Sequence, residues 1–330
     1  MNLACSCAGI IEKAITLMKK YSAKLAVLAA MAIVTAGCVI GQARAARTRP
    51  APPRQTLVEH LIQQLTSRTN GSFSFTGPVS GGGYAGPPTL TTNFWLRDVT
   101  NILASSLGMI QYHCLYSDAS FVTPISPRHV LSAAHMGGQG LDKSVWLLPD
   151  GTLYTNTAVV LANGQPAREF IHGADITITL MQKTNPYVCK YLPDITSKVA
   201  AWKTHNFKTN PVPPFVRFHL NGRSGLPWHT SFISEGRGMG FFGGNETSNF
   251  TLFGDYTKGD VWVGGDSASP AYAIINNEAV LICVASTGGG GSAIANFTNQ
   301  INAAMASLSK NNGAPVYQLT PCDVSRFSDQ

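Results

Sequence analysis

Three short stretches of the sequence hold residues that could act together in nucleophilic catalysis. In the first, RHVLSAAHMGG (128–138), an apolar strand pattern ends at His135, just before two glycines. A histidine at the mouth of a strand suits a general base, because imidazole titrates near neutral pH. For any one of the eight histidines taken alone, an ordinary core or surface role is the simpler interpretation.

The second stretch, HGADITITLMQK (172–183), places an acid at the head of an alternating strand. Asp175 precedes Ile176, Ile178 and Leu180, which share one face. A carboxylate in this position needs a hydrogen-bond donor. An imidazole N–H would serve, and the carboxylate would stabilise the imidazolium formed during proton transfer. In isolation, a turn residue that starts a strand is the simpler interpretation.

The third stretch, VWVGGDSASP (261–270), holds two serines in a glycine-containing loop. Gly264 and Gly265 permit backbone conformations that aim successive N–H groups into one concavity, which an oxyanion requires. A serine in this loop has its hydroxyl beside those donors. The alternative is an ordinary Gly-Asp-Ser turn. The pattern alone does not distinguish Ser267 from Ser269.

Short strand-like runs separated by Gly, Asn, Asp and Pro predict the elements that position these residues. They fall into two β-rich halves of similar length, separated by KTNPVPPF (208–215), and include SFVTPI, HVLSAAH, SVWLLPDG, TAVVLANG, DITITLM, FVRFHLNG, HTSFIS, NFTLFGD, PAYAIINN and AVLICVAST. This pattern is typical of an all-β barrel or sandwich. Near the C-terminus, Ile301, Met305 and Leu308 follow helical spacing and Gly313 marks the stop.

Together, the three stretches resemble the motifs of chymotrypsin/trypsin-like serine peptidases. SPRHVLSAAH is similar to the family's TAAH motif, DITITL to its DIAL strand and GGDSASP to its GDSGGP loop. AVLICVASTGG is similar to the strand that follows that loop. The order His, Asp, Ser is the order of this family. The resemblance covers roughly residues 109–312, about two thirds of the chain.

The resemblance implies an all-β fold of two antiparallel six-stranded β-barrels with a C-terminal α-helix. His135 would be the general base and then the general acid, Asp175 its orienting partner and Ser267 the nucleophile. The backbone N–H groups of Gly265 and Ser267 would form the oxyanion hole. Asp266 would shape the loop.

The same resemblance implies where a substrate would bind. Ser286, Thr287 and Gly288 would line the edge that pairs with substrate backbone. Val261, six residues before Ser267, would lie at the base of the specificity pocket. Because this residue is uncharged, a preference for Lys or Arg is disfavoured and an apolar or small side chain is expected.

The chain departs from the family pattern in several places. Ala268 stands where the family has glycine, so its methyl group either demands an ordinary φ or crowds the leaving-group side. The loop after His135 has Met136 instead of a cysteine, so packing around Met136 must hold it. No IVGG-like N-terminus precedes the histidine strand, so Asp266 must find a partner other than a new amino terminus.

The N-terminal region reads as an export signal followed by a tether. Lys19, Lys20 and Lys24 precede the uncharged run LAVLAAMAIVTAGCVIG, which leads into an A-x-A site. Alternatives are an uncleaved anchor and a lipid anchor at Cys38. The following organisation is expected: residues 1–45 a signal peptide, with Met18 as an alternative start; 46–94 a linker or pro-segment; 95–207 the N-terminal barrel; 208–313 the C-terminal barrel with the helix; and 314–330 a tail. A short amphipathic helix is predicted from Leu57, Leu61, Ile62 and Leu65.

Charge and cysteine content exclude several classes. The net charge of +7 falls to +3 without residues 1–45, and no basic stripe remains, so no nucleic-acid partner is expected. The four cysteines after residue 45 permit two disulfides or buried thiols, and none has a CxxC neighbour that would indicate zinc. They are Cys114, Cys189, Cys283 and Cys322. No metal or cofactor is expected.

The sequence therefore predicts a secreted, periplasmic or cell-surface serine endopeptidase that is monomeric and acts on polypeptides. Two alternatives stay open. One is a protease-like binding protein that has lost turnover, and the other is an esterase with the same three residues. An α/β-hydrolase is disfavoured because the chain order differs and no G-x-S-x-G elbow surrounds Ser267.

Overall fold

The computed structural model describes residues that all lie in one compact unit, Arg54–Gln330. The described residues are 54–69, 79–80, 89–90, 96–99, 108–110, 121–136, 143–195, 198, 215–220, 228–233, 237–242, 250–254, 267–287 and 290–328. The expected signal peptide lies outside them, as do Val261, Gly265, Asp266 and Gly288. No helix in the described part of the chain is both long and apolar enough to cross a membrane.

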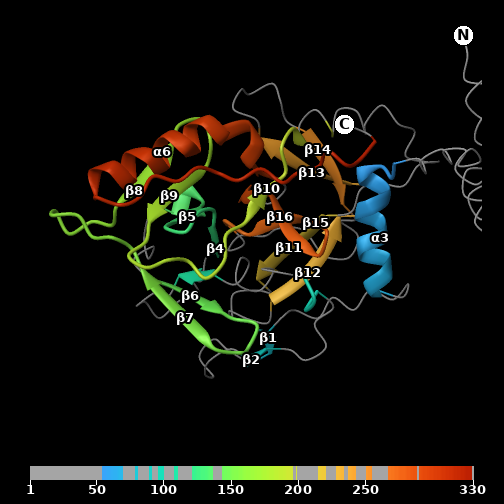
Figure 1. The fold of residues 1–330 in the computed structure, drawn as a ribbon, viewed down its shortest axis with the longest axis horizontal. Coiled ribbons are helices and arrows are strands. Elements are labelled where there is room, and N and C mark those ends of the chain that lie inside the picture. The colour runs from blue at the N-terminus through green and yellow to red at the C-terminus, as the bar shows by residue number, and fades with distance from the viewer. Residues whose placement is uncertain are drawn as a thin grey trace, which may run out of the picture. The chain divides into compact units, whose positions relative to one another are not determined.

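The first half of the protein forms an antiparallel sheet of seven described strands in the order β7-β6-β3-β4-β5-β9-β8 (Figure 1). Its strands are β3 (Gly108–Ile110), β4 (Phe121–Pro124), β5 (His129–Ser132), β6 (Lys143–Leu147), β7 (Leu153–Thr157), β8 (Arg168–Ile171) and β9 (Ile176–Leu180). Every residue of β4, β5 and β9 is buried. These three strands therefore form a rigid frame beneath the residues that follow β5 and precede β9.

The second half forms a sheet of eight described strands in the order β12-β11-β15-β16-β17-β13-β14, with β10 paired to β16. Its strands are β10 (Lys190–Tyr191), β11 (Phe215–Leu220), β12 (Trp228–Ile233), β13 (Arg237–Phe242), β14 (Phe250–Gly254), β15 (Pro270–Ile275), β16 (Glu278–Thr287) and β17 (Gly290–Ala293). A separate pair consists of β1 (Val79–Ser80) and β2 (Thr89–Leu90).

The structure is thus mostly β with a C-terminal helix, as the sequence predicts. The two closed six-stranded barrels are not resolved. One expected strand forms only in part: in TAVVLANG, Thr157 belongs to β7 and Ala158 bridges Met181, whereas the residues from Val160 onward form an excursion closed by the bridge Val160↔Pro166. Its turn has Gly164 at φ +79°, which glycine accommodates without strain.

A two-residue turn joins β15 to β16. Ile275 pairs with Glu278, and the intervening Asn276 and Asn277 have φ of 54° and 60°. Two successive positive φ angles are the signature of a type I′ turn, and asparagine tolerates them better than most residues. The local sequence therefore sets the register of this hairpin, whose opposite end begins directly after Ser267 and Ser269 of the serine loop.

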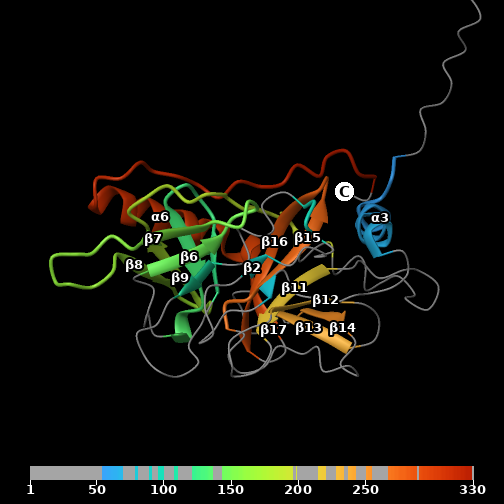
Figure 2. The same cartoon turned by 90° about the horizontal axis from the view of Figure 1, so that it is seen from below.

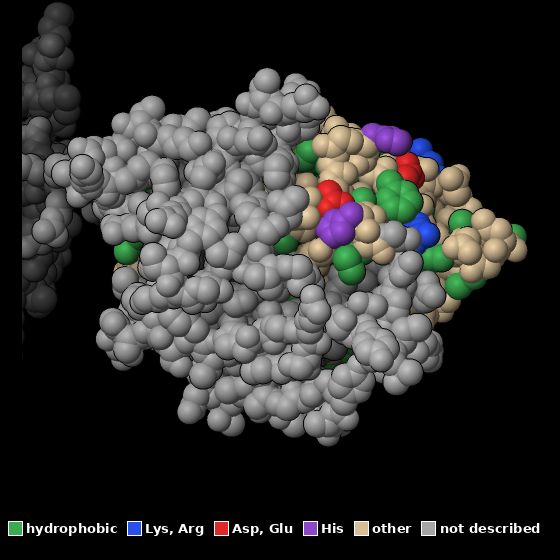
Figure 3. All heavy atoms as spheres, turned by 180° about the vertical axis from the view of Figure 1, so that it is seen from behind, with side chains coloured by type: hydrophobic (Ala, Val, Ile, Leu, Met, Phe, Trp, Pro, Cys, Tyr) green, Lys and Arg blue, Asp and Glu red, His purple; other side chains and the backbone are tan. Residues whose placement is uncertain are grey.

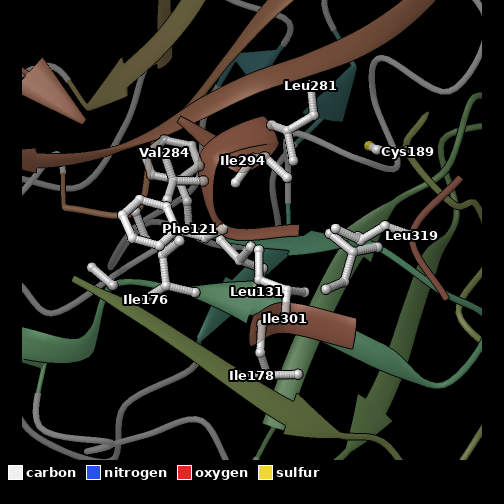
Figure 4. Close-up of a cluster of buried hydrophobic side chains, with 14 of the residues drawn as sticks. Phe121, Leu131, Ile176, Ile178, Cys189, Leu281, Val284, Ile294, Ile301 and Leu319 are labelled. Atoms are coloured by element: carbon white, nitrogen blue, oxygen red, sulfur yellow. The ribbon is translucent and has the colours of Figure 1, made fainter. Parts of the chain in front are cut away.

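The largest buried cluster joins both sheets to the C-terminal helix α6 (Thr298–Asn311), which follows the 3₁₀ turn Ile294–Phe297. Figure 4 shows Leu131 and Ile178 of the first sheet converging on Ile301 of the helix. Leu281 and Val284 of β16 belong to the same cluster. The helix runs along β8 and β9 (Figures 1 and 2). Its buried face has the spacing that the sequence predicts.

Helix α3 (Leu57–Thr69) covers β15 and begins with a reciprocal capping box (Figure 1). The Thr56 backbone N–H donates to Glu59, and the Glu59 backbone N–H donates to the Thr56 hydroxyl. Leu57 and Leu61 are fully buried against residues of the second sheet. This helix falls in the segment expected to be a linker or pro-segment.

The described cysteines do not support two disulfides. Cys283 and Cys322 are free and buried. Two of the four thiols are therefore unpaired, and Cys114 lies outside the described residues. Burial raises the pKa of both thiols, that of Cys322 to about 11. They are consequently protonated at neutral pH and unreactive.

A fully buried histidine ties β5 to α6. His129 Nδ1 lies 2.7 Å from the Ser126 hydroxyl, and its Nε2 lies 3.4 Å from the Ser309 hydroxyl. The Tyr317 ring approaches edge-on at 6.2 Å between centroids. Burial, reinforced by the neighbouring charge of Arg128, lowers the pKa of His129 from 6.5 to about 4. The imidazole is therefore neutral in the fold at neutral pH.

The pH dependence of stability follows from the lowered pKa of His129. The folded protein binds this proton only near pH 4, whereas the unfolded chain binds it near pH 6.5. The free energy of unfolding should therefore fall as pH drops from about 6.5 to 4, by roughly 3 kcal/mol from this group. Urea unfolding at a series of pH values between about 6.5 and 4 measures this change in the free energy of unfolding. His129→Gln should flatten the profile, whereas replacing the exposed His172 by Gln should not. An equally steep profile in His129→Gln would contradict the assignment.

Candidate active site

The register of the first sheet brings His135 and Asp175 to the same end of two neighbouring strands. Ser132, the last residue of β5, pairs with Thr177 of the antiparallel β9. His135 follows this pair in the 3₁₀ turn Ala134–Met136, and Asp175 directly precedes β9. His135 and Asp175 therefore leave one rigid frame side by side.

The second sheet places Ser267 and Ser286 together in the same manner. Pro270 of β15 pairs with Val284 of β16. Beyond this pair, the Ala268 N–H donates to the Ala285 carbonyl, and the Ala285 N–H donates to the Ser269 carbonyl. The serine loop therefore lies along the end of β16.

The side chains from the two sheets form one hydrogen-bonded chain. His135 Nδ1 contacts Asp175 Oδ2, and His135 Nε2 lies 2.6 Å from Ser267 Oγ. A carboxylate can only accept, so the Nδ1 position carries the proton. The Nε2 lone pair is then left to accept the Ser267 hydroxyl proton. This tautomer is the one required for a base that activates Ser267.

The Asp175 carboxylate receives three donors. Its Oδ1 accepts the His135 backbone N–H at 2.7 Å, and its Oδ2 accepts the Ser286 hydroxyl at 2.7 Å as well as the imidazole. Three fixed donors hold both carboxylate oxygens in place. The sequence placed Ser286 only on the substrate edge, and this bond was not foreseen because it depends on the approach of the two sheets.

The site is open to solvent on the imidazole side. The His135 side chain is 43% exposed and that of Asp175 is 20% exposed. Figure 3 shows histidine and acidic side chains side by side on the face in view. Met136 packs against the main core cluster, as expected for a loop without a cysteine. In the described part of the chain, no group of three His, Cys, Asp or Glu side chains could hold a metal ion.

The two serines of the loop have different environments. Ser267 is partly exposed and contacts His135, whereas Ser269 is fully buried. The Ser269 hydroxyl makes no hydrogen bond within the described structure. Only Ser267 therefore combines access to solvent with a base.

Ala268 has a left-handed backbone, with φ +67°, and its methyl group is fully buried in the main core cluster. Of the two alternatives that the sequence left open for Ala268, an ordinary φ is therefore excluded. Such a conformation costs alanine roughly 1–2 kcal/mol. Burial of the methyl group offsets about 0.8 kcal/mol of this cost.

The remaining predicted residues are only partly described. Thr287 ends β16 and pairs with Gly290 of β17, so two residues join these strands. β17 then runs so close to β16 that a Cβ on Gly291 would lie 2.1 Å from the Val284 carbonyl oxygen. Only glycine fits there. Val261, Gly265 and Gly288 lie outside the described residues.

No family model and no curated protein matches the chain. Solved structures of proteases do. The chain is similar to the secreted serine protease VesC from Vibrio cholerae, with 12% identity and a TM-score of 0.36, over 60% of this chain and 45% of that one. It therefore spans less than half the length of VesC. It is also similar to the MamO protease domain from Magnetospirillum magneticum, with 11% identity and a TM-score of 0.33, over 56% and 85% of the two chains.

A third similar structure is the inactivated protease paralogue S-D1 of the scabies mite, with 10% identity and a TM-score of 0.39, over 66% of this chain and 95% of that one. These three solved structures are of proteases or of a protease paralogue.

Replacing Ser286 by Ala should slow the reaction of Ser267 with a fluorophosphonate about tenfold. Hydrogen bonds to charged groups contribute about 1.5–3 kcal/mol, and Asp175 would lose one of its three donors. The rate of labelling, followed by intact mass, measures the effect. Ser325→Ala, in the exposed C-terminal tail, is the matched control. Labelling of Ser286→Ala at the unmodified rate would remove Ser286 from the site.

Substitutions at Ala268 should separate backbone strain from packing. Ala268→Gly removes the left-handed penalty but also a buried methyl group, so the free energy of unfolding should change by less than about 1 kcal/mol. Ala268→Val adds β-branching at positive φ and two carbons in a packed core, and should cost at least about 2 kcal/mol. Urea unfolding midpoints distinguish the two. An unchanged midpoint in Ala268→Val would contradict the described backbone.

Proposed function

We propose that this protein is an exported serine endopeptidase that cleaves peptide bonds through a Ser267 acyl-enzyme. The observation that carries the proposal is the continuous hydrogen-bonded chain from Ser267 through His135 to Asp175. Nucleophile, base and orienting acid are all within hydrogen-bond reach, which is the geometric requirement for an activated serine. The exposed imidazole leaves room for a substrate beside Ser267.

The first half of the reaction forms the acyl-enzyme. Ser267 Oγ attacks the carbonyl carbon of the scissile bond while His135 Nε2 takes the hydroxyl proton. The resulting imidazolium is stabilised by Asp175, which stays ionised. When the C–N bond breaks, the imidazolium returns this proton to the leaving amine. Water then attacks the ester, again with His135 as base, and regenerates the serine.

The developing oxyanion would be held by the backbone N–H groups of Gly265 and Ser267. Removing one donor of such a pair typically costs 10²–10³ in turnover. Substrate backbone would lie along Ser286, Thr287 and Gly288. Val261, as an uncharged residue at the base of the specificity pocket, would favour an apolar or small substrate side chain over Lys or Arg.

The same proposal includes export and a polypeptide substrate. The basic residues, apolar run and A-x-A site of residues 1–45 support release into the periplasm or the medium. A monomer suffices, because all three side chains of the site come from one chain.

A fluorophosphonate probe should label the signal-free protein at Ser267, because its Oγ lies 2.6 Å from His135 Nε2, within reach of a general base. Ser267→Ala should abolish labelling, and His135→Ala or Asp175→Asn should reduce it by at least about 10³-fold. Ser269→Ala is the matched control in the same loop and should label normally. Peptide mapping by mass spectrometry locates the adduct.

The outcomes separate the candidate functions. Labelling together with cleavage of casein or a peptide panel supports the endopeptidase. Labelling with ester hydrolysis but intact peptides would favour an esterase. A folded protein that binds peptides without labelling would be a protease-like binding protein, and labelling at Ser269 would overturn the assignment of the nucleophile.

A further inference from the structure

Helix α3 holds together three segments that are distant in sequence. At its C-terminal end, the Arg68 guanidinium forms an ion pair with Asp98 at 2.8 Å and donates to the Asn277 side chain at 2.6 Å. The Arg68 side chain is only 9% exposed. The helix is thus bonded both to the segment that follows it and to the turn of the β15–β16 hairpin.

The first turns of α3 contact that same hairpin and the C-terminal tail. His60 is 6% exposed, and its Nε2 accepts the Asn276 backbone N–H at 3.3 Å. The Phe327 ring packs on the imidazole at 5.0 Å between centroids, and Arg326 lies beside it while donating to the Asn276 side chain. In Figures 1 and 2 the tail runs from α6 back to α3.

Hydrogen bonds and apolar burial extend this contact to the start of the helix. The Ser328 backbone N–H donates to the Gln55 carbonyl. Leu57 and Leu61 are fully buried in a core cluster that also contains Ala273 and Phe327. Removing the two buried leucines would expose this cluster to water, which destabilises the fold.

A detachable segment would be expected to cover a surface that is complete without it. Here the helix supplies core side chains, a capping box at its start and, at its end, an arginine whose side chain is only 9% exposed. The uncut chain already has Ser267, His135 and Asp175 in contact while the helix is docked. The helix therefore contributes to the fold and does not keep the three side chains apart.

We infer that residues 55–69 are a permanent part of the folded protein, docked between the β15–β16 turn and the C-terminal tail, and are not a pro-segment removed on maturation. Any proteolytic cleavage of the N-terminal region then takes place before Gln55, at or upstream of the exposed Arg54. The sequence left open whether residues 46–94 are a linker or a pro-segment. For residues 55–69, the inference replaces both roles with that of a structural element of the fold.

Cutting the chain after the helix tests the inference directly. A site-specific protease sequence inserted between Gly71 and Ser72 of the full chain lets the helix be severed after folding. The N-terminal fragment should co-elute with residues 72–330 on gel filtration and separate only in denaturant. Release of the fragment in buffer from a remainder that stays folded would overturn the inference.

Variants of the helix make the test quantitative. In the cut protein, Leu61→Ala combined with Arg68→Ala should release most of the fragment, whereas Ser67→Ala, on the exposed face, should release no more than the unmodified protein. In the uncut chain the double variant should melt several degrees lower. Equal retention by all three cut proteins would show that these contacts do not hold the helix.

The natural N-terminus supplies a second, independent measurement. The intact mass of the exported protein should place its first residue at or before Gln55. A mature form that begins after Thr69 would overturn the inference. Neither measurement requires turnover, so the result holds whether or not Ser267 reacts.

Discussion

The Asp175 carboxylate is the interaction on which the candidate site depends. It accepts two donors from the His135 residue of its own sheet and one from Ser286 of the other sheet. One carboxylate therefore joins the base to both halves of the site. Because a partly buried carboxylate without donors is costly, these bonds determine how the two sheet ends can meet.

This arrangement explains why the site stands on strands that are buried along their length. β5 and β9 hold His135 and Asp175 through one antiparallel register, and β15 and β16 hold Ser267 and Ser286 through another. A slip of one residue in either pair would exchange the two buried faces of the strand and so remove its apolar side chains from the cluster that both sheets share. The packing of the core and the geometry of the site therefore depend on the same strand register.

The residue after Ser267 has a strained backbone. Ala268 adopts a left-handed conformation that glycine would adopt without cost, and its methyl group lies in the core cluster that also contains Val284 and Tyr272. Strain at a functional loop persists only when the surroundings over-determine the conformation. Here the backbone bonds between the loop and Ala285 provide that restraint.

Much of the secondary structure could be predicted from the sequence, because strands, helices and turns depend on local residue patterns. Alternating apolar residues predicted β9, helical spacing predicted the buried face of α6, and Asn276-Asn277 marks a type I′ turn. TAVVLANG misled because apolar residues in an exposed excursion have the same composition as a strand. The short strand β8 was missed because its mixed charged and apolar residues lack a clear alternation.

The sequence by itself pointed to His135, Asp175 and Ser267 as candidate residues and determined their order along the chain, since strand ends and a glycine loop are local features. Only the tertiary structure decided that the hydroxyl of Ser267 faces the imidazole while that of Ser269 is buried. The bond from Ser286 to Asp175 and the docking of α3 on the C-terminal tail were likewise decided at that level. Each of these contacts joins segments more than a hundred residues apart, and the register and packing of the sheets, not local pattern, bring them together.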